Sequence, residues 1–192
     1  MKTTRIRQAL KFAIYAQAVN IMLITTANAD PVQGSLGSTS QGSLDIRVSK
    51  PARARISDLN DLTLASWVTG DGDVKLKDDV CVYSSKVQGG YTIKASGSGA
   101  NSAFTLANGT ETLPYTVAWN SGGVGNLGDT GTSLTANVTS ARLTGASRDS
   151  SSCSGKNPGP TARIIVGMLA TDLDAAIDGT YDGTLTLLVT PN

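Results

Sequence analysis

Hydrophobic and polar residues alternate over short stretches along much of the chain. Between residues 43 and 49, Leu44, Ile46 and Val48 occupy one side of an extended backbone, until Pro51 interrupts the pattern. A period of two residues places alternate side chains on one face and predicts a half-buried β-strand. The same pattern predicts strands over 55–59, 80–84, 91–95, 103–106, 115–119, 134–138, 163–168 and 184–189.

Helical periodicity is almost absent after the N-terminal region. No window longer than about ten residues keeps a 3.6-residue period, and ATDLDAA (170–176) predicts at most one helical turn. Clusters of Gly, Ser, Asn and Asp separate most of the predicted strands. Many short strands at this spacing predict an all-β fold, a sandwich of antiparallel sheets, over residues 51–192.

Residues 1–29 have the composition of a secretory signal peptide. Four cations without an acid precede a mostly apolar stretch, and Ala27-Asn28-Ala29 supplies small residues for cleavage. We predict export with cleavage between Ala29 and Asp30. A transmembrane anchor is the alternative, but polar residues interrupt an apolar stretch shorter than the roughly 20 residues that a span needs.

The remaining chain begins with a small, polar segment. Residues 30–42 lack the apolar surface that offsets the entropy of ordering, so we expect residues 30–50 to form a flexible N-terminal arm. Of the 16 Lys and Arg residues, four belong to the signal peptide, which leaves 12 against 15 Asp and Glu. A slightly acidic chain argues against binding nucleic acid or inserting into an anionic membrane.

Cys81 and Cys153 are the only cysteines, and the chain contains no His. In an oxidising compartment, two cysteines without other metal ligands indicate one structural disulfide and no metal site. Closing a loop of about 70 residues would stabilise the fold by roughly 4 kcal/mol on the chain-entropy model.

Several patterns that suggest chemistry lack the context that the chemistry needs. Gly123–Gly128 matches GxGxxG, but no helix follows to hold a pyrophosphate. The acidic stretch from Asp71 to Asp79 lacks the EF-hand spacing and contains two lysines, so it predicts a solvated hairpin tip rather than a calcium site. No His is present to activate a Ser, and the only Glu, Glu111, lies in a predicted turn. We therefore expect no enzymatic activity and no cofactor.

Three segments taken together resemble subunits of chaperone-usher pili. LDIRVSKPARARISDL (44–59) resembles the start of such mature subunits, LPYTVAW (113–119) a middle strand, and GTYDGTLTLLVTP (179–191) the last strand. The chain is similar to CS1-type fimbrial subunits and spore-coat-U-like archaic pilins. Pro191 in place of an aromatic residue, and the cysteine spacing, depart from the usual patterns and leave the subfamily open.

The resemblance implies an immunoglobulin-like sandwich that lacks its last strand and is completed by a neighbour's N-terminal extension. It implies that Leu44, Ile46 and Val48 are the apolar residues of this donor strand. It also implies that an acceptor groove runs beside the last strand, lined by Leu185, Leu187 and Val189. A periplasmic chaperone and an outer-membrane usher are the expected assembly partners.

The leading hypothesis is therefore a structural subunit of a surface fibre of a Gram-negative bacterium, serving adhesion or biofilm formation. Periodicity alone also allows 44–49 to be an ordinary first strand of its own domain. The alternative function is a monomeric exported module that binds glycan or protein through loops such as 120–132, with Trp67, Trp119 or a tyrosine stacking on a sugar. A secreted enzyme with an unrecognised carboxylate pair is a weaker third option.

Overall fold

The computed structural model describes residues 30–151 and 159–192. The chain divides into two compact units, Met1–Ser49 and Lys50–Asn192. All the named strands and helices of the described residues belong to the second unit, which we call the sandwich unit. In the first unit, Val32 and Ser43 form an isolated antiparallel bridge, with both backbone hydrogen bonds at 2.9 Å.

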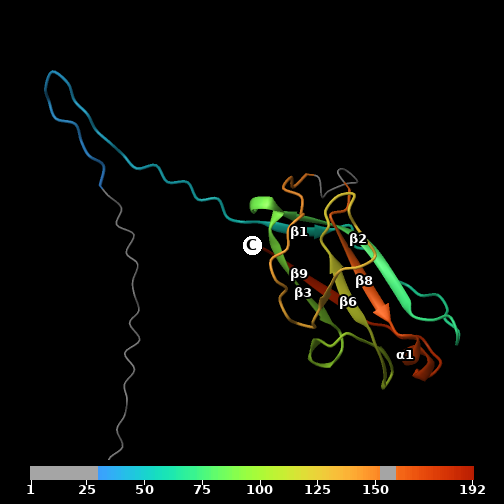
Figure 1. Ribbon diagram of the computed structural model, residues 1–192. Coiled ribbons are helices and arrows are strands. Elements are labelled where there is room, and N and C mark those ends of the chain that lie inside the picture. The colour runs from blue at the N-terminus through green and yellow to red at the C-terminus, as the bar shows by residue number, and fades with distance from the viewer. Residues whose placement is uncertain (1–29, 152–158) are drawn as a thin grey trace, which may run out of the picture. The chain divides into compact units, whose positions relative to one another are not determined.

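The sandwich unit is built almost entirely from strands (Figure 1). Its strands are β1 (Ala54–Ser57), β2 (Val74–Ser84), β3 (Tyr91–Gly97), β4 (Thr105–Asn108), β5 (Glu111–Pro114), β6 (Thr116–Asn120), β7 (Thr132–Leu134), β8 (Ala162–Met168) and β9 (Leu185–Pro191). One helix, α1 (Ala170–Ala175), and two short 3-10 turns, η1 (Val87–Gly89) and η2 (Ala100–Ser102), complete the described elements.

The strands form one large sheet and two smaller ladders. The large sheet has five strands in the order β1-β2-β8-β6-β7, while β3 pairs with β9 and β4 pairs with β5. Every one of these ladders is antiparallel. The prediction of an all-β, antiparallel fold is confirmed.

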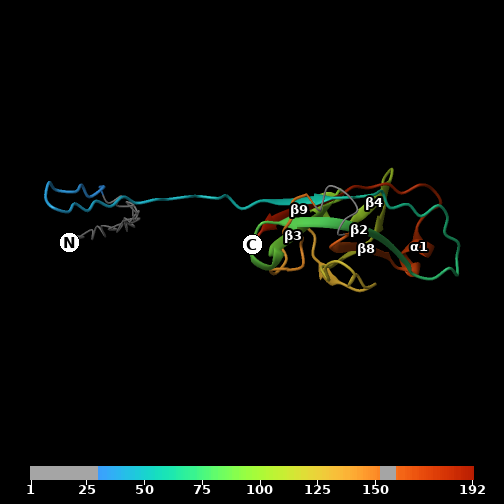
Figure 2. The same ribbon diagram turned by 90° about the horizontal axis from the view of Figure 1, so that it is seen from above.

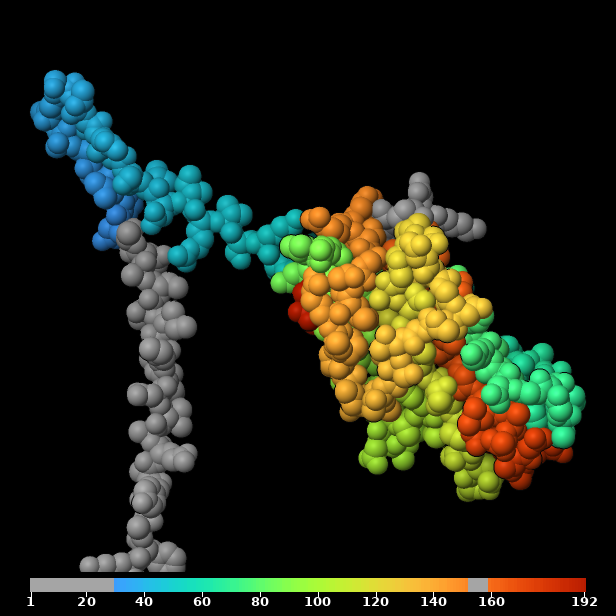
Figure 3. All heavy atoms as spheres, viewed as in Figure 1, coloured from blue at the N-terminus to red at the C-terminus, as the bar shows by residue number. Residues whose placement is uncertain are grey.

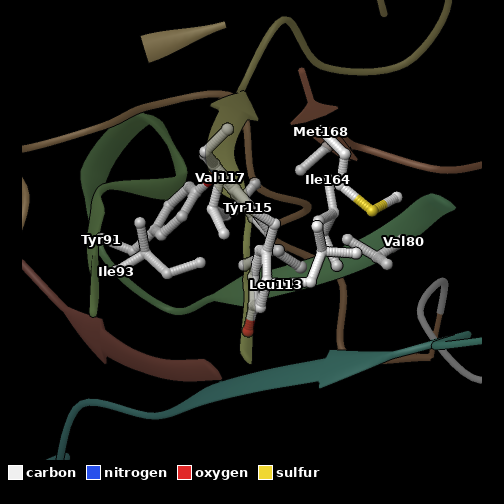
Figure 4. Close-up of a cluster of buried hydrophobic side chains, with 12 residues drawn as sticks. Val80, Tyr91, Ile93, Leu113, Tyr115, Val117, Ile164 and Met168 are labelled. Carbon is white, nitrogen blue, oxygen red and sulfur yellow. The ribbon is translucent and has the colours of Figure 1, made fainter. Parts of the chain in front are cut away.

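One hydrophobic core joins the large sheet to the β3–β9 ladder (Figure 4). Val80 of β2 and Ile93 of β3 are completely buried, and Trp119 of β6 is 1% exposed. Leu185, Leu187 and Val189 of β9 pack against this core while remaining half-buried. Alternate residues of each strand therefore face the same apolar interior, as the period-two pattern requires.

The predicted strands over 91–95, 163–168 and 184–189 are confirmed, with ends that differ by one or two residues. β2 is longer than predicted, because it begins at Val74 within the stretch expected to be a hairpin tip. Leu76 packs against the core while Lys75 and Lys77 are exposed. An antiparallel sheet accepts this arrangement because its outer face is open to solvent.

The region around Glu111 also differs from its prediction. Glu111 begins β5 instead of lying in a turn, and the stretch expected as one strand over 115–119 follows a break. Pro114 ends β5 and has no N–H to continue a ladder. The N–H of Tyr115 donates to the Phe104 carbonyl at 2.9 Å, and β6 then starts at Thr116.

The predicted strand over 134–138 is wrong in its extent, since β7 ends at Leu134. Asn137 adopts a left-handed backbone with φ of 59°, which an extended strand does not contain. The short helix predicted over 170–176 is present but exceeds the single turn expected, because α1 has six residues before an extended Ala176.

Candidate functional site

The three apolar residues predicted to line an acceptor groove share one face of β9. Leu185, Leu187 and Val189 are half-buried and pack against the core, whereas the residues between them are exposed. β9 pairs with β3 along its whole length, from Leu185 opposite Gly97 to Pro191 opposite Tyr91. The ladder fixes the register and so directs the three side chains inward.

Two edge strands lie close together at this place. Within the described residues, β9 belongs to a ladder only with β3, and β1 is one of the two edge strands of the large sheet. β1 and β9 approach each other without forming a ladder. A strand edge that is not in a ladder offers backbone donors and acceptors to another chain. The site thus combines two neighbouring strand edges with half-buried apolar side chains.

The candidate donor residues belong to the first unit. Leu44, Ile46 and Val48 are 69%, 85% and 87% exposed, and residues 44–49 are in no strand. The sequence pattern is therefore present without the strand that it predicts. Pairing of this segment with a neighbouring copy stays a prediction, and so does its alternative, pairing within its own chain.

Two further predictions concern residues at the limits of what the structure describes. Cys81 lies in β2 and is 1% exposed, while Cys153 lies outside the described residues. The disulfide therefore stays a prediction. Ala29 also lies outside the described residues and Asp30 is the first residue within them, so the cleavage site stays a prediction as well.

An ion-pair network occupies the outer face of the large sheet. The guanidinium of Arg163 in β8 contacts Asp79 of β2 at 2.5 and 2.9 Å and Asp129 at 2.9 Å. The ammonium of Lys77 contacts the same Asp129 carboxylate at 2.7 Å. We did not predict this network, although the alternation of Lys75, Lys77 and Asp79 already places charges on one side of β2.

The network shifts the pKa values of Asp79, Asp129 and Arg163 in the directions that favour their charged forms. The hydrogen bond from Arg163 lowers the pKa of Asp79, and the hydrogen bond from Lys77 lowers that of Asp129. The hydrogen bond to Asp79 raises the pKa of Arg163. These pairs fix the loop after β6 to the sheet.

A hollow of about 210 Å³ lies between that loop and the sheet. Asn120 holds the loop by donating from its side-chain amide to the Thr130 carbonyl at 2.7 Å. The hollow is lined by Lys75, Thr116, Ala118, Asp129, Thr130, Gly131, Ile165 and Gly167. Its size and polar rim suit a group no larger than a monosaccharide.

The acidic stretch considered for calcium sends its carboxylates to separate partners. Asp71 accepts from the Val68 N–H at 3.0 Å, and Asp73 accepts from the Ala170 N–H at 2.8 Å. Asp78 is buried and accepts from both the backbone and the side-chain amide of Asn60, each at 2.9 Å. Across 30–151 and 159–192, no three His, Cys, Asp or Glu residues gather as metal ligands.

The described residues contain no helix long and apolar enough to cross a bilayer.

Comparisons with solved structures find a structural likeness. No protein-family profile matches the chain, and no curated protein matches it. A chain of the solved structure described as "Chaperone-tip adhesin complex is vital for synergistic activation of CFA/I fimbriae biogenesis" matches 72% of this chain, at 16% identity and a TM-score of 0.48. The match covers 41% of that chain, so this chain spans less than half of its length. The strand pairing of this chain by itself establishes the all-β, antiparallel fold.

Proposed function

We propose that this chain is a structural subunit of a bacterial surface fibre, assembled by strand exchange through the chaperone-usher pathway. Neighbouring copies or related subunits, a periplasmic chaperone and an outer-membrane usher are its proposed partners. The proposed location is the cell surface, reached through the periplasm. Adhesion or biofilm formation is the proposed role of the fibre.

The observation that carries the proposal is the open edge of β9. Leu185, Leu187 and Val189 pack against the core yet remain half-buried, although β9 forms its ladder with β3 over seven residue pairs. A further strand laid along the edge of β9 that is not paired with β3 would flank these three side chains and pair with β9. In an antiparallel sandwich, this is the addition that joins an edge strand to another chain.

The N-terminal segment has the chemistry of such a strand. Leu44, Ile46 and Val48 alternate with polar residues, and all three are exposed. Burial of one such side chain contributes roughly 1.5 to 3 kcal/mol, so the three together contribute about 5 to 9 kcal/mol before the cost of ordering the segment. Because each copy carries both the segment and the open edge, repetition of one head-to-tail contact gives an open fibre.

The deciding experiment compares residues 30–192 with a version that starts at Pro51. Both are analysed by size-exclusion chromatography with light scattering, before and after mild heating in detergent. We expect the longer protein to form detergent-resistant oligomers and the truncated one to stay monomeric. A stable monomer in both forms would reject strand exchange.

A matched pair of variants locates the contact within the segment. Ile46→Asp places a carboxylate among the three apolar residues and should abolish the oligomers, because a charge cannot be buried there without a partner. Ser49→Asp adds the same charge on the opposite side of the strand and should leave them intact. Loss of oligomers in both variants would indicate a general effect of charge and not the burial of Ile46 in the donor strand.

A synthetic peptide of residues 43–50 gives an independent test. It should raise the thermal unfolding midpoint of the protein that starts at Pro51, because it binds the folded form. The same peptide with Asp at position 46 should have no effect.

The hollow beside Asp129 favours one second candidate, a monomeric recognition module for a glycan. The loop 120–132, singled out from the sequence, supplies three of its lining residues, Asp129, Thr130 and Gly131. A glycan array with the Pro51 version would test this function. Binding that is lost in Thr130→Trp, together with a monomeric full-length protein, would favour it over the fibre subunit.

A further inference from the structure

One end of the sandwich unit combines exposed apolar residues with carboxylates. Thr69 donates to Asp174 at 2.8 Å and the Ala170 N–H to Asp73 at 2.8 Å, so the segment before β2 lies against α1 (Figure 3). The exposed apolar residues there are Val68, Leu169 and Ile177. The exposed carboxylates are Asp71, Asp73, Asp174 and Asp178. Residues 66–73 and 169–178 contain no Lys or Arg, and we call this surface the acidic end.

The opposite end carries cations around an exposed valine. The Arg53 and Ser85 backbones are joined by a hydrogen bond of 2.9 Å, which places Arg53 beside Lys86 at the start of η1. Arg142 donates to the Val87 carbonyl at 2.9 Å and to the Asn192 oxygen at 3.3 Å. Val87 itself is 72% exposed. We call this surface the basic end.

β2 separates the two ends. It follows Asp73 at the acidic end and runs for 11 residues to Ser84, next to the basic end, a distance of roughly 35 Å at the usual rise of a strand. Figures 1 and 2 both show α1 at one end of the unit and the C-terminus at the other. The two surfaces therefore cannot neutralise each other within one copy.

β9 runs between the same two ends. Pro191 lies opposite Tyr91, and the following Asn192 N–H donates to Gly90 at the basic end. At the other end of β9, Asp182, which precedes the first residue of the strand, pairs with Ala107 of β4. β4 pairs with β5, and β5 contacts α1. Leu185 is thus on the side of the acidic end.

We infer that the acidic end of one copy contacts the basic end of the next copy in the fibre. The inference rests on the proposed strand exchange and names the surfaces that meet beside it. A donor segment pairing antiparallel with β9, as every ladder of this unit does, would finish beside Leu185. Residues 50–53 then allow at most roughly 17 Å before β1 of the donor copy begins. The basic end of the donor copy must therefore lie against the acidic end of the acceptor copy.

The charges at the two ends also favour a donor segment that is antiparallel to β9 over one that is parallel to it. A donor segment parallel to β9 would finish beside Pro191 and bring Arg53 and Lys86 of the donor copy against the same cations of the acceptor copy. Like charges at short range repel, whereas opposite surfaces accelerate encounter. The antiparallel arrangement also covers Val87, Val68 and Leu169, which are exposed in the single copy.

The test measures the rate at which residues 30–192, diluted from denaturant, form detergent-resistant oligomers at low and high salt. We expect the rate to fall by about tenfold between roughly 0.02 M and 0.5 M salt, because screening weakens the attraction between the ends. Asp178→Lys and Lys86→Asp should each slow assembly several-fold at low salt and reduce the salt dependence. Neither side chain is part of a strand or of the open edge of β9.

Ser133→Lys is the control, since it adds a cation on β7, between the two ends. It should assemble at the rate of the unmodified protein, and circular dichroism should show all variants folded. A rate that rises with salt, or wild-type rates for both end variants at low salt, would overturn the contact while leaving strand exchange intact. If the unmodified protein forms no resistant oligomers, strand exchange fails and the contact fails with it.

Discussion

The indole Nε1 of Trp119 in β6 donates a hydrogen bond of 2.9 Å to the hydroxyl oxygen of Tyr91 in β3. Both residues are among the most buried of the chain, at 1% and 0% exposure. The bond joins the five-stranded sheet to the β3–β9 ladder across the core. It therefore ties the strand that holds β9 to the rest of the sandwich unit.

Tyr91→Phe should destabilise the fold, because it leaves the buried Trp119 N–H without its acceptor. The expected loss is about 1 to 3 kcal/mol of unfolding free energy. Tyr115→Phe is the matched control, since it keeps the ring that stacks on Phe104 at a centroid distance of 5.5 Å. Urea unfolding measures both. Equal losses in the two variants would contradict the role assigned to the Trp119 bond.

Tyr91 should also make the protein sensitive to alkaline pH. Burial raises the pKa of Tyr91 to about 12, above the ordinary 10.0, because the folded chain holds the phenol in its neutral form. The unfolded chain releases this proton above pH 10, so the stability is complete below pH 10 and is lost as the pH rises to about 12. Two pKa units correspond to about 2.7 kcal/mol. Unfolding curves at several pH values should show this loss, and Tyr91→Phe should reduce it; an unchanged slope would contradict the assignment.

At acid pH, the Asp79–Arg163 pair should contribute a small pH dependence. The Arg163 hydrogen bond lowers the pKa of Asp79, so this contribution is present above the ordinary carboxyl range and is lost as the pH falls through the lowered value. The pair is partly exposed, so Asp79→Asn should cost less than about 1 kcal/mol at neutral pH. Urea midpoints from pH 3 to 7 should be flatter in this variant than in Asp178→Asn. Identical pH profiles in the two variants would argue against the pair.

The predicted disulfide has a direct test. Cys81 is buried in β2, and its pairing with Cys153 would close a loop worth roughly 4 kcal/mol in the chain-entropy model. Cys153→Ser should therefore lower the unfolding midpoint by as much as the double change with Cys81→Ser. Mass spectrometry after alkylation in denaturant without reductant should detect no free thiol in the unmodified protein. Two alkylated cysteines under these conditions would rule out the bridge.

Strands could be predicted from the sequence where apolar residues alternate regularly with polar residues on the outward face. In β3 and β9, polar residues such as Thr92 and Thr186 alternate with apolar ones, and both strands were predicted. The first half of β2 was not predicted, because Lys75 and Lys77 on its outward face and Asp78 on its inward face gave the stretch a charged composition. Asp78 occupies a core-facing position only because Asn60, distant in the sequence, supplies two hydrogen bonds.

The sequence by itself determined the all-β fold, because alternation between apolar and polar residues is a local property of each strand. It also marked Leu185, Leu187 and Val189 as one face of the last strand. Only the tertiary structure decided that β9 lies near β1 without a ladder between them, and that cations and carboxylates gather at opposite ends of the sandwich unit. Strand order and the grouping of charges from distant segments depend on how sheets pack, and periodicity within one segment does not encode that packing.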